Sequence, residues 1–326
     1  MKVFVTGATG FTGGQLARAL AARGYEVSAL VRDPGRAGDL AAAGIRLVPG
    51  DLVDTASWAS SIRGAQVLYN IAALYRQAGL PVATYRRVNA VAVGKVVEAA
   101  ASAGVGRVVH CSTVGVHGDV EHPPADEDAP LRPGDRYQET KLEGERLGLE
   151  AARQTGIELT IARPSGIYGP GDRRLLKLFR GVARRRFAVL GDGRIFYHLT
   201  YIEDLVEGLR LCGEVPRAAG RTYILAGPEV STLNDLVAII AREAGVVPLR
   251  IRLPVWPFWA AGAACEIVCR PLGIEPPIYR RRVDFFTKSR AFRIDRARGE
   301  LGYAPVVGLR DGIRRTLTWY KERGWI

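Results

Sequence analysis

Tyr137 and Lys141 are the side chains of this sequence best suited to acid–base chemistry. They stand four residues apart at the start of a helical pattern, residues 135 to about 154, so both project from one face of the expected helix. A tyrosine has an unperturbed pKa of about 10 and is a poor base near neutrality, but an adjacent ammonium stabilises its phenolate. A hydroxyl from Thr113 or Ser112, at the end of an apolar segment, would hydrogen-bond the substrate oxygen with which the tyrosine exchanges its proton. This set predicts proton exchange with an alcohol or a ketone.

A glycine-rich turn near the N-terminus is the second chemical feature. It reads TGATGFTG over residues 6–13 and lies between an apolar run and a long helical pattern rich in alanine and leucine. Gly7 suits a tight turn, Gly10 lets the main chain approach a pyrophosphate, and Gly13 lets the helix pack closely on its strand. The helix N-terminus then offers unpaired N–H groups and a partial positive charge to phosphates. The pattern predicts a nucleotide site formed by Gly7, Thr9, Gly10, Phe11, Thr12 and Gly13.

The end of the second expected strand, residues 25–31, indicates which nucleotide fits. The adenosine ribose should lie there, where an acidic residue would bind its two hydroxyls and an arginine would instead bind a 2′-phosphate. The sequence places Val31 and Arg32 at this point, which favours NADP. Asp33 follows directly, and a shift of one residue would return a carboxylate to the ribose, so NAD stays open.

Two further strand ends would face the same ligand. The apolar segment 45–48 leads to Asp51 and Leu52, and the segment 66–71 leads to Ala72 and Ala73. Because strand ends on one edge of a parallel sheet form the ligand crevice, the first pair is placed to meet adenine and the two alanines leave room for the cofactor. A long helix is expected over 81–103, followed by a fifth strand over 105–112.

The alternation of strands and helices predicts the fold class. Repeated strand–helix units imply right-handed crossovers, so we expect an α/β fold with a Rossmann-type doubly wound parallel sheet and a smaller C-terminal substrate lobe. The nucleotide-binding domain is expected over 1–165, with 200–228 returning to it, and the substrate lobe over 166–199 and 229–326. Within the lobe the sequence indicates a basic helix over 172–186 and a strand pair around Ala188 and Phe196.

Together these segments resemble the extended short-chain dehydrogenase/reductase family, which contains sugar-nucleotide epimerases, 3β-hydroxysteroid dehydrogenases and dihydroflavonol reductases. The resemblance spans nearly the whole chain and implies that Thr113, Tyr137 and Lys141 are the catalytic set. Counting back from Gly118 puts Thr113, rather than Ser112, at the catalytic position. The matching pieces are Thr6–Gly13, Gly50-Asp51-Leu52, Asn89, Cys111-Ser112-Thr113, Tyr137–Lys141 and Arg163–Pro170.

The resemblance also implies how the chain would hold a nicotinamide cofactor. Lys141 would bind the nicotinamide ribose, and Asn89 would support the lysine through the backbone or a water. Pro164 and Ser165, at the end of the sixth strand, would flank the nicotinamide, which carries the hydride. With Tyr137 and Ser112, these residues complete the expected cofactor site.

Two departures from the family pattern narrow the activity. Sugar-nucleotide 4,6-dehydratases carry an Asp-Glu pair after the catalytic hydroxyl, and Val114-Gly115 replaces it here, which disfavours water loss. Epimerases usually carry an arginine for the diphosphate where this chain has Tyr197, with Arg194 three residues earlier. The preferred hypothesis is therefore reversible hydride transfer between NADP or NAD and a secondary alcohol or ketone.

Two other functions stay open. One is a UDP-sugar 4-epimerase with bound NAD, which the general family pattern and the basic charge support. The other is an NADP-sensing regulator without chemistry, against which the intact Tyr137 argues because sensor relatives tend to lose the tyrosine.

Composition constrains the partners. The net charge of +13 and the pI near 9.9 suit an anionic partner, and the runs 184–186 and 280–282 concentrate arginine. No nucleic-acid module is visible, so we expect a solvated basic surface and an anionic cofactor rather than nucleic acid. The four cysteines show no metal-ligand spacing, and the N-terminus enters a strand without a signal-peptide pattern. We expect no metal and a cytoplasmic location.

An apolar stretch over Leu253–Ile274 is the remaining feature. Prolines and charges interrupt it, which disfavours a transmembrane helix. Two interpretations remain: a buried helix that walls an apolar pocket, which we favour, or a segment that dips into a membrane surface. Either favours a hydrophobic substrate. Relatives often dimerise through the helices that carry Asn89 and Tyr137, so the resemblance also implies a homodimer.

Overall fold

A seven-stranded sheet forms the centre of the larger lobe. In the computed structural model, which describes residues 1–76, 79–249, 251–269 and 280–326, every pairing within this sheet is parallel. The strand order is β10-β6-β5-β4-β1-β2-β3, which confirms the expected Rossmann-type α/β class. The strands are β1 (Lys2–Thr6), β2 (Glu26–Val31), β3 (Arg46–Pro49), β4 (Val67–Asn70), β5 (Arg107–Cys111), β6 (Glu158–Pro164) and β10 (Thr222–Leu225).

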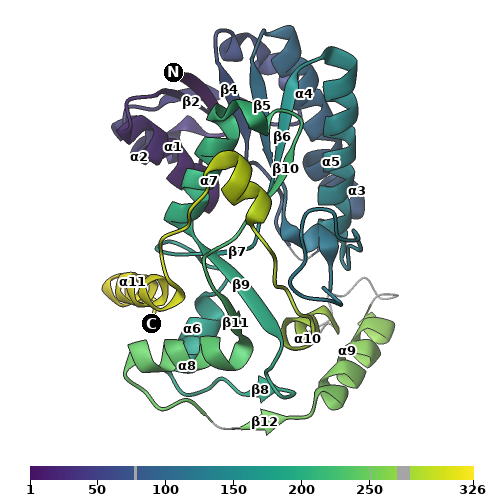
Figure 1. Cartoon of the computed structure of the whole chain (residues 1–326), viewed down its shortest axis with the longest axis vertical. Helices are drawn as coiled ribbons and strands as arrows, with labels where there is room; N and C mark the ends of the chain where they lie inside the picture. The colour runs from purple at the N-terminus through teal and green to yellow at the C-terminus, as the bar shows by residue number, and fades with distance from the viewer. Residues whose placement is uncertain (77–78, 250, 270–279) are drawn as a thin grey trace.

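Helices cover both faces of this sheet (Figure 1). Val5 packs in one buried cluster with Leu16 and Leu205, whereas Phe4, whose side chain points to the opposite face, packs in a second cluster with Val96. The first face is covered by α1 (Phe11–Ala22) and α7 (Ile202–Glu214), and the second by α4 (Ala92–Ser102) and α5 (Arg136–Thr155).

The helix expected over 81–103 has the predicted extent but is not a regular α-helix. It consists of α3 (Val82–Arg86), a π-helical turn η4 (Arg87–Val91) and then α4. Short elements complete the lobe: α2 (Gly38–Ala42), η1 (Pro34–Arg36), η2 (Thr55–Ser57), η3 (Ala59–Ile62), η5 (Val114–His117) and η6 (Pro216–Ala218).

The smaller lobe contains two small sheets. β7 (Gly166–Tyr168), β9 (Phe196–Tyr201) and β11 (Val230–Thr232) form one, and β8 (Val189–Leu190) pairs with β12 (Arg252–Leu253) to form the other. The expected pairing of the strands around Ala188 and Phe196 is therefore wrong, because each finds its partner in a distant segment. Its helices are α6 (Leu176–Ala183), shorter than the expected 172–186, α8 (Leu233–Ala244), α9 (Val255–Cys269), α10 (Arg280–Thr287) and α11 (Leu309–Glu322). The π-helical turn η7 (Ala297–Leu301) instead packs against α7, η6 and β10 of the larger lobe.

Helix α9 is mostly not buried, so the favoured interpretation of 253–274 as a buried helix is wrong for its described part. Among the described side chains of α9 only Gly262 and Glu266 are buried, whereas Trp256 is 73% and Ile267 73% exposed. Apolar side chains occur on every side of this helix, and among the described residues its packing against α10 leaves part of them exposed. Residues 270–274 lie outside the described residues. No helix in the described part of the chain is long and apolar enough to cross a membrane.

Candidate active site

A cavity of about 830 Å³ opens at the carboxyl ends of the parallel strands. It extends from the glycine turn after β1 to Tyr197 and Phe285 of the smaller lobe, so both lobes form its wall. Of the residues expected at the site, sixteen line this cavity: Gly7, Thr9, Gly10, Phe11, Thr12, Gly13, Arg32, Asp51, Leu52, Ala72, Ala73, Ser112, Thr113, Tyr137, Pro164 and Ser165. Lys141 and Asn89 are not among the described lining residues.

The glycine turn has the geometry that a pyrophosphate requires. Gly7 has a φ of 71°, in the left-handed region, and a Cβ on Gly13 would lie 2.3 Å from the Gly7 oxygen. Gly10 caps α1 without a side chain, so no side chain covers the first N–H groups of this helix. These amides and the helix dipole face the cavity and fit a dinucleotide phosphate.

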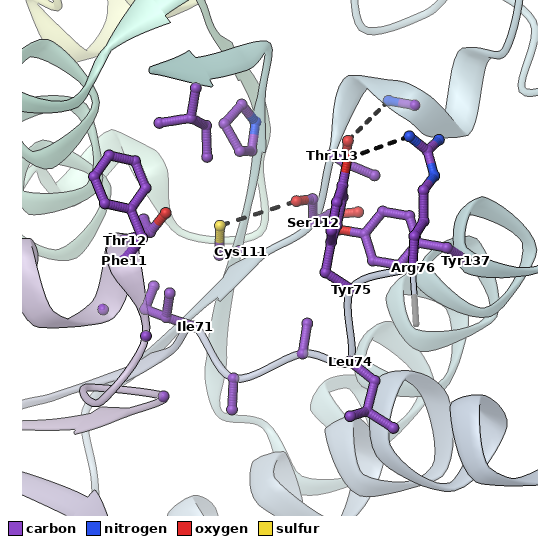
Figure 2. Close-up of a pocket in the computed structure, with 18 of the residues that line it drawn as sticks. Phe11, Thr12, Ile71, Leu74, Tyr75, Arg76, Cys111, Ser112, Thr113 and Tyr137 are labelled. Carbon is purple, nitrogen blue, oxygen red and sulfur yellow. Dashed lines mark hydrogen bonds between the residues drawn. The ribbon is translucent and has the colours of Figure 1, made fainter. Parts of the chain in front are cut away.

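Tyr137 lies in the first turn of α5. Asp135 begins this helix, since its carboxylate accepts a hydrogen bond of 3.0 Å from the Gln138 amide. Thr113 faces the same part of the cavity from the end of β5, and its Oγ1 accepts a hydrogen bond of 3.0 Å from the Gly115 amide (Figure 2). This contact leaves the hydroxyl hydrogen of Thr113 for a ligand.

Two residues that the sequence analysis missed, Tyr75 and Arg76, contact the Tyr137 ring. The Tyr75 ring meets the Tyr137 ring edge-on with centroids 5.1 Å apart, and the Arg76 guanidinium carbon lies 5.6 Å from the Tyr137 centroid (Figure 2). Burial raises the pKa of Tyr137, while Arg76 and Arg174 partly oppose that shift. The position of Tyr75 and Arg76 directly after the expected strand end at Ala72-Ala73 was a signal that could have found them.

Lys141 lies behind the cavity wall, where burial lowers its pKa to about 8. Its ammonium donates a hydrogen bond of 2.7 Å to the Cys111 carbonyl and lies 3.2 Å from Nε2 of His110. His110 is fully buried, and burial together with Lys141 lowers its pKa well below the usual value, so its ring is neutral. No hydrogen bond joins Lys141 to Tyr137 in the described part of the chain.

A row of polar side chains crosses the sheet beside Lys141. Thr6 on β1, Asn70 on β4 and His110 on β5 are neighbours in the strand register. The Thr6 hydroxyl donates to Oδ1 of Asn70 over 2.8 Å, and Nδ2 of Asn70 lies 3.2 Å from Nδ1 of His110. The Thr6 oxygen also accepts from the amides of Ile71 and Ala72, which begin the cavity wall. The row thus connects Lys141 to the cavity wall after β4.

The side chain of Asn89 fixes the segment that carries Tyr75. Its Oδ1 accepts a hydrogen bond of 2.8 Å from the Leu74 amide, and its Nδ2 donates to the Leu74 carbonyl over 3.0 Å and to Thr140 over 3.3 Å. The side-chain amide thus connects η4, the loop after β4 and α5. Support of Lys141 through the backbone of Asn89 or a water stays a prediction.

Unpartnered hydroxyls also face the cavity. The oxygens of Ser112 and Ser165 are buried and have no hydrogen-bond partner among the described residues. Buried hydroxyls normally find partners, so these two are available for a bound molecule. With the bare helix N-terminus of α1, they make the cavity fit a nicotinamide dinucleotide.

A buried ion pair holds α5 against β6 one turn beyond Lys141. Arg163 donates two hydrogen bonds to Glu145, of 2.6 Å and 3.0 Å, and a third of 3.2 Å to the Glu127 carbonyl. Both charged side chains are less than 7% exposed. This pair orients the helix that carries Tyr137 and Lys141.

Comparison with known proteins identifies the family. The model of the NAD dependent epimerase/dehydratase family matches residues 3–226. The chain belongs to this family. Members of the NAD dependent epimerase/dehydratase family bind the cofactor for which the cavity is suited, and the match confirms the resemblance to extended short-chain dehydrogenases/reductases.

Two of the proteins similar to this chain are a dehydrogenase/decarboxylase and a reductase. The 3β-hydroxysteroid-dehydrogenase/decarboxylase isoform 1 of Arabidopsis thaliana is 30% identical over 294 residues, which cover 84% of this chain and 66% of that protein, so the chain spans slightly less than two thirds of that relative's length. The 2-alkyl-3-oxoalkanoate reductase of Stenotrophomonas maltophilia is 29% identical over 327 residues, with 97% of this chain and 98% of the relative covered.

Solved structures of family members superpose over almost the full length. The crystal structure of gox2253 has a TM-score of 0.84 and 30% identity, with 99% of both chains covered. MoeE5 in complex with UDP-glucuronic acid and NAD has a TM-score of 0.78 and 26% identity, with 99% of this chain and 100% of that chain covered.

Proposed function

We propose that this family member is an NAD(P)-dependent oxidoreductase that interconverts a secondary alcohol and a ketone. The observation that carries the proposal is the cavity itself, because the glycine turn, Thr113 and Tyr137 line one continuous space. The names of the relatives from Arabidopsis and Stenotrophomonas, a dehydrogenase and a reductase, support it. The proposed substrate is a secondary alcohol or ketone with a hydrophobic body.

In this mechanism the protein residues position and protonate the substrate oxygen. Thr113 donates its free O–H to that oxygen, while Tyr137 exchanges the proton with it. Since burial raises the pKa of Tyr137, its phenol is protonated at neutral pH and is ready to donate during ketone reduction. When bound, NAD(P) would supply or accept the hydride. Lys141 would hold the nicotinamide ribose.

NADP is the proposed cofactor, and Arg32 carries this preference. Arg32 lines the cavity at the end of β2, whereas Asp33 is not among the described lining residues. The Asp33 carboxylate instead accepts a hydrogen bond of 3.0 Å from the Gly35 amide and so caps η1. With the Asp33 carboxylate engaged in this cap, the Arg32 guanidinium is suited to bind a 2′-phosphate. Equilibrium titration with NADPH and NADH tests this: wild type should prefer NADPH, Arg32→Gln should lose that preference, and equal affinities in wild type would contradict it.

The test of the oxidoreductase function is turnover of the reduced nicotinamide. Ketones with hydrophobic chains, presented with NADPH, should cause a continuous loss of its absorbance that requires Tyr137. Catalytic epimerisation of a UDP-sugar without net change in the cofactor would contradict the proposal and support the epimerase.

The epimerase is the second candidate because one observation favours it. The structural neighbour MoeE5 is solved with UDP-glucuronic acid and NAD. The sensor without chemistry is disfavoured because Thr113 and Tyr137 both line the cavity.

Three further proposals concern partners and location. We propose a homodimer formed through α4 and α5, which pack side by side on one flank (Figure 1); a monomeric mass by light scattering would contradict it. We propose peripheral membrane contact through the exposed tryptophans of α9, tested by co-sedimentation with anionic vesicles. We propose a cytoplasmic location, which the four free cysteines support because a reducing compartment keeps thiols unpaired.

A further inference from the structure

The charges around the cavity are strongly unequal. The described charged residues that line it are Arg32, Asp51, Arg76, Arg87, Arg174 and Arg290, so one carboxylate faces five guanidinium groups. Arg32 and Asp51 belong to the adenosine end, after β2 and β3. Arg290, in contrast, comes from the smaller lobe beside Tyr197 on β9, and not from the glycine turn or the strand ends expected to hold the cofactor.

Two of the guanidinium groups already have carboxylate partners. Arg76 donates a hydrogen bond of 2.7 Å to Asp135. Arg174 donates one of 2.7 Å to Asp172 and one of 3.1 Å to the Ile167 carbonyl. Their charges are balanced by the protein, and their contacts hold them beside Tyr75.

Arg290 has no carboxylate partner among the described residues, although the smaller lobe holds it in a defined place. Its backbone forms an isolated parallel bridge with Tyr197 on β9, and its amide donates to the Phe196 carbonyl over 2.9 Å. Its guanidinium lies beside the Tyr197 hydroxyl, where it partly opposes the rise that burial causes in the pKa of Tyr197. That hydroxyl donates to the Phe285 carbonyl, so the tyrosine neighbours the guanidinium without neutralising it.

A guanidinium that lines a cavity and lacks a counter-charge is suited to bind an anion from a ligand. Its planar fork pairs with carboxylate or phosphate oxygens through charge-assisted hydrogen bonds. Tyr197 is uncharged and has its hydroxyl hydrogen on Phe285, so it adds no repulsion toward an anion.

We infer that Arg290, beside Tyr197, forms an anion subsite in the substrate half of the cavity and binds a carboxylate or phosphate group of the substrate. The inference rests on the proposed function for its link to catalysis, since the anion would anchor the molecule whose alcohol or ketone faces Tyr137. It adds a charged end to a substrate with a hydrophobic body.

The binding experiment uses full-length protein saturated with the oxidised cofactor. Calorimetry compares decanoate with decanamide for the carboxylate and UDP with uridine for the phosphate, in wild type and in Arg290→Gln. At least one anion should bind wild type more tightly than its neutral partner. Arg290→Gln should weaken that anion about 10- to 100-fold and leave the neutral partner unchanged. Arg290→Lys keeps the charge, so its affinity for that anion should lie between those of wild type and Arg290→Gln.

Arg194→Gln is the matched control, because Arg194 is exposed on the same lobe and does not line the cavity. Its anion affinity should equal that of wild type, and thermal melting should show that all variants are folded. If Arg290→Gln bound both anions as tightly as wild type, or if wild type preferred neither anion to its neutral partner, the subsite would be refuted.

A turnover experiment separates this inference from the proposed function. Acetoacetate and levulinate are compared with their methyl esters as substrates for NADPH oxidation. Arg290→Gln should lower the acid-over-ester ratio of kcat/KM while ester turnover persists. Ester turnover with the same ratio in wild type and variant would keep the oxidoreductase and overturn the subsite. Anion binding that depends on Arg290 without turnover of any ketone would keep the subsite and overturn the oxidoreductase.

Discussion

The burial of Lys141 makes the stability of the cofactor-free protein depend on pH in a specific window. The pKa of this lysine is lowered to about 8, from an ordinary value of 10.5, because the side chain is only 1% exposed. Between these two values the unfolded chain binds more protons than the folded one, so the free energy of unfolding rises with pH. From pH 7 to pH 10 the lysine contributes a gain of about 2.5 kcal/mol.

Urea unfolding of wild type and Lys141→Met at pH 7, 8, 9 and 10 measures this gain. Methionine keeps most of the apolar stem and cannot titrate, so the stability of wild type minus that of the variant should rise by about 2.5 kcal/mol over the series. The buried tyrosines have raised pKa values, so they lower the free energy of unfolding at high pH. This effect is the same in both proteins and cancels in the difference. Lys95→Met, at an exposed position on α4, is the control and should give a flat difference.

A flat difference between wild type and Lys141→Met would refute the reasoning, because it would mean that the lysine keeps its ordinary pKa in the fold. A falling difference would mean that an unrecognised anion stabilises the ammonium. Either result would also mean that Lys141 does not lose part of its charge near pH 8 in the cofactor-free protein.

Three other substitutions have defined outcomes. Tyr137→Phe should lower kcat for ketone reduction about 100- to 10,000-fold with cofactor affinity retained, which stopped-flow and titration measure; unchanged kcat would move the proton donor elsewhere. Gly13→Ala places a Cβ 2.3 Å from a backbone oxygen and should cost about 1–3 kcal/mol and weaken NADPH binding, whereas Gly299→Ala, with open space around it, should do neither. Glu145→Gln leaves the Arg163 charge buried and should destabilise the fold by about 3–5 kcal/mol in urea; a loss below about 1 kcal/mol would show that the charge reaches water.

The sequence was sufficient for the parts of the site that local rules determine. A glycine turn between a strand and a helix has few alternative structures, and residues directly after parallel strands must meet at one sheet edge. For this reason Arg32, Asp51, Ala72 and Thr113 were placed correctly in the cavity wall. The parallel sheet followed from strand–helix alternation in the same way.

The parts that the sequence could not predict depend on contacts between distant segments. Arg290 reaches the cavity through a bridge to Tyr197, and no local pattern encodes a pairing across ninety-three residues. Helical spacing puts Lys141 on the same helix face as Tyr137, but it does not show that the ammonium contacts His110 and the Cys111 carbonyl of β5. Apolar composition alone could not tell whether α9 has enough partners to be buried, and its exposed Trp256 shows that it does not.

The polar row through Thr6, Asn70 and His110 forms only when β1, β4 and β5 are in the correct register. Each of the three strands contributes one link, and a slip of one residue in any of them would turn its polar side chain to the opposite face. Lys141 would then lose its imidazole neighbour, and the wall after β4 would lose the Thr6 oxygen that accepts its amides. Correct alignment of β1, β4 and β5 is therefore a condition for chemistry as well as for folding.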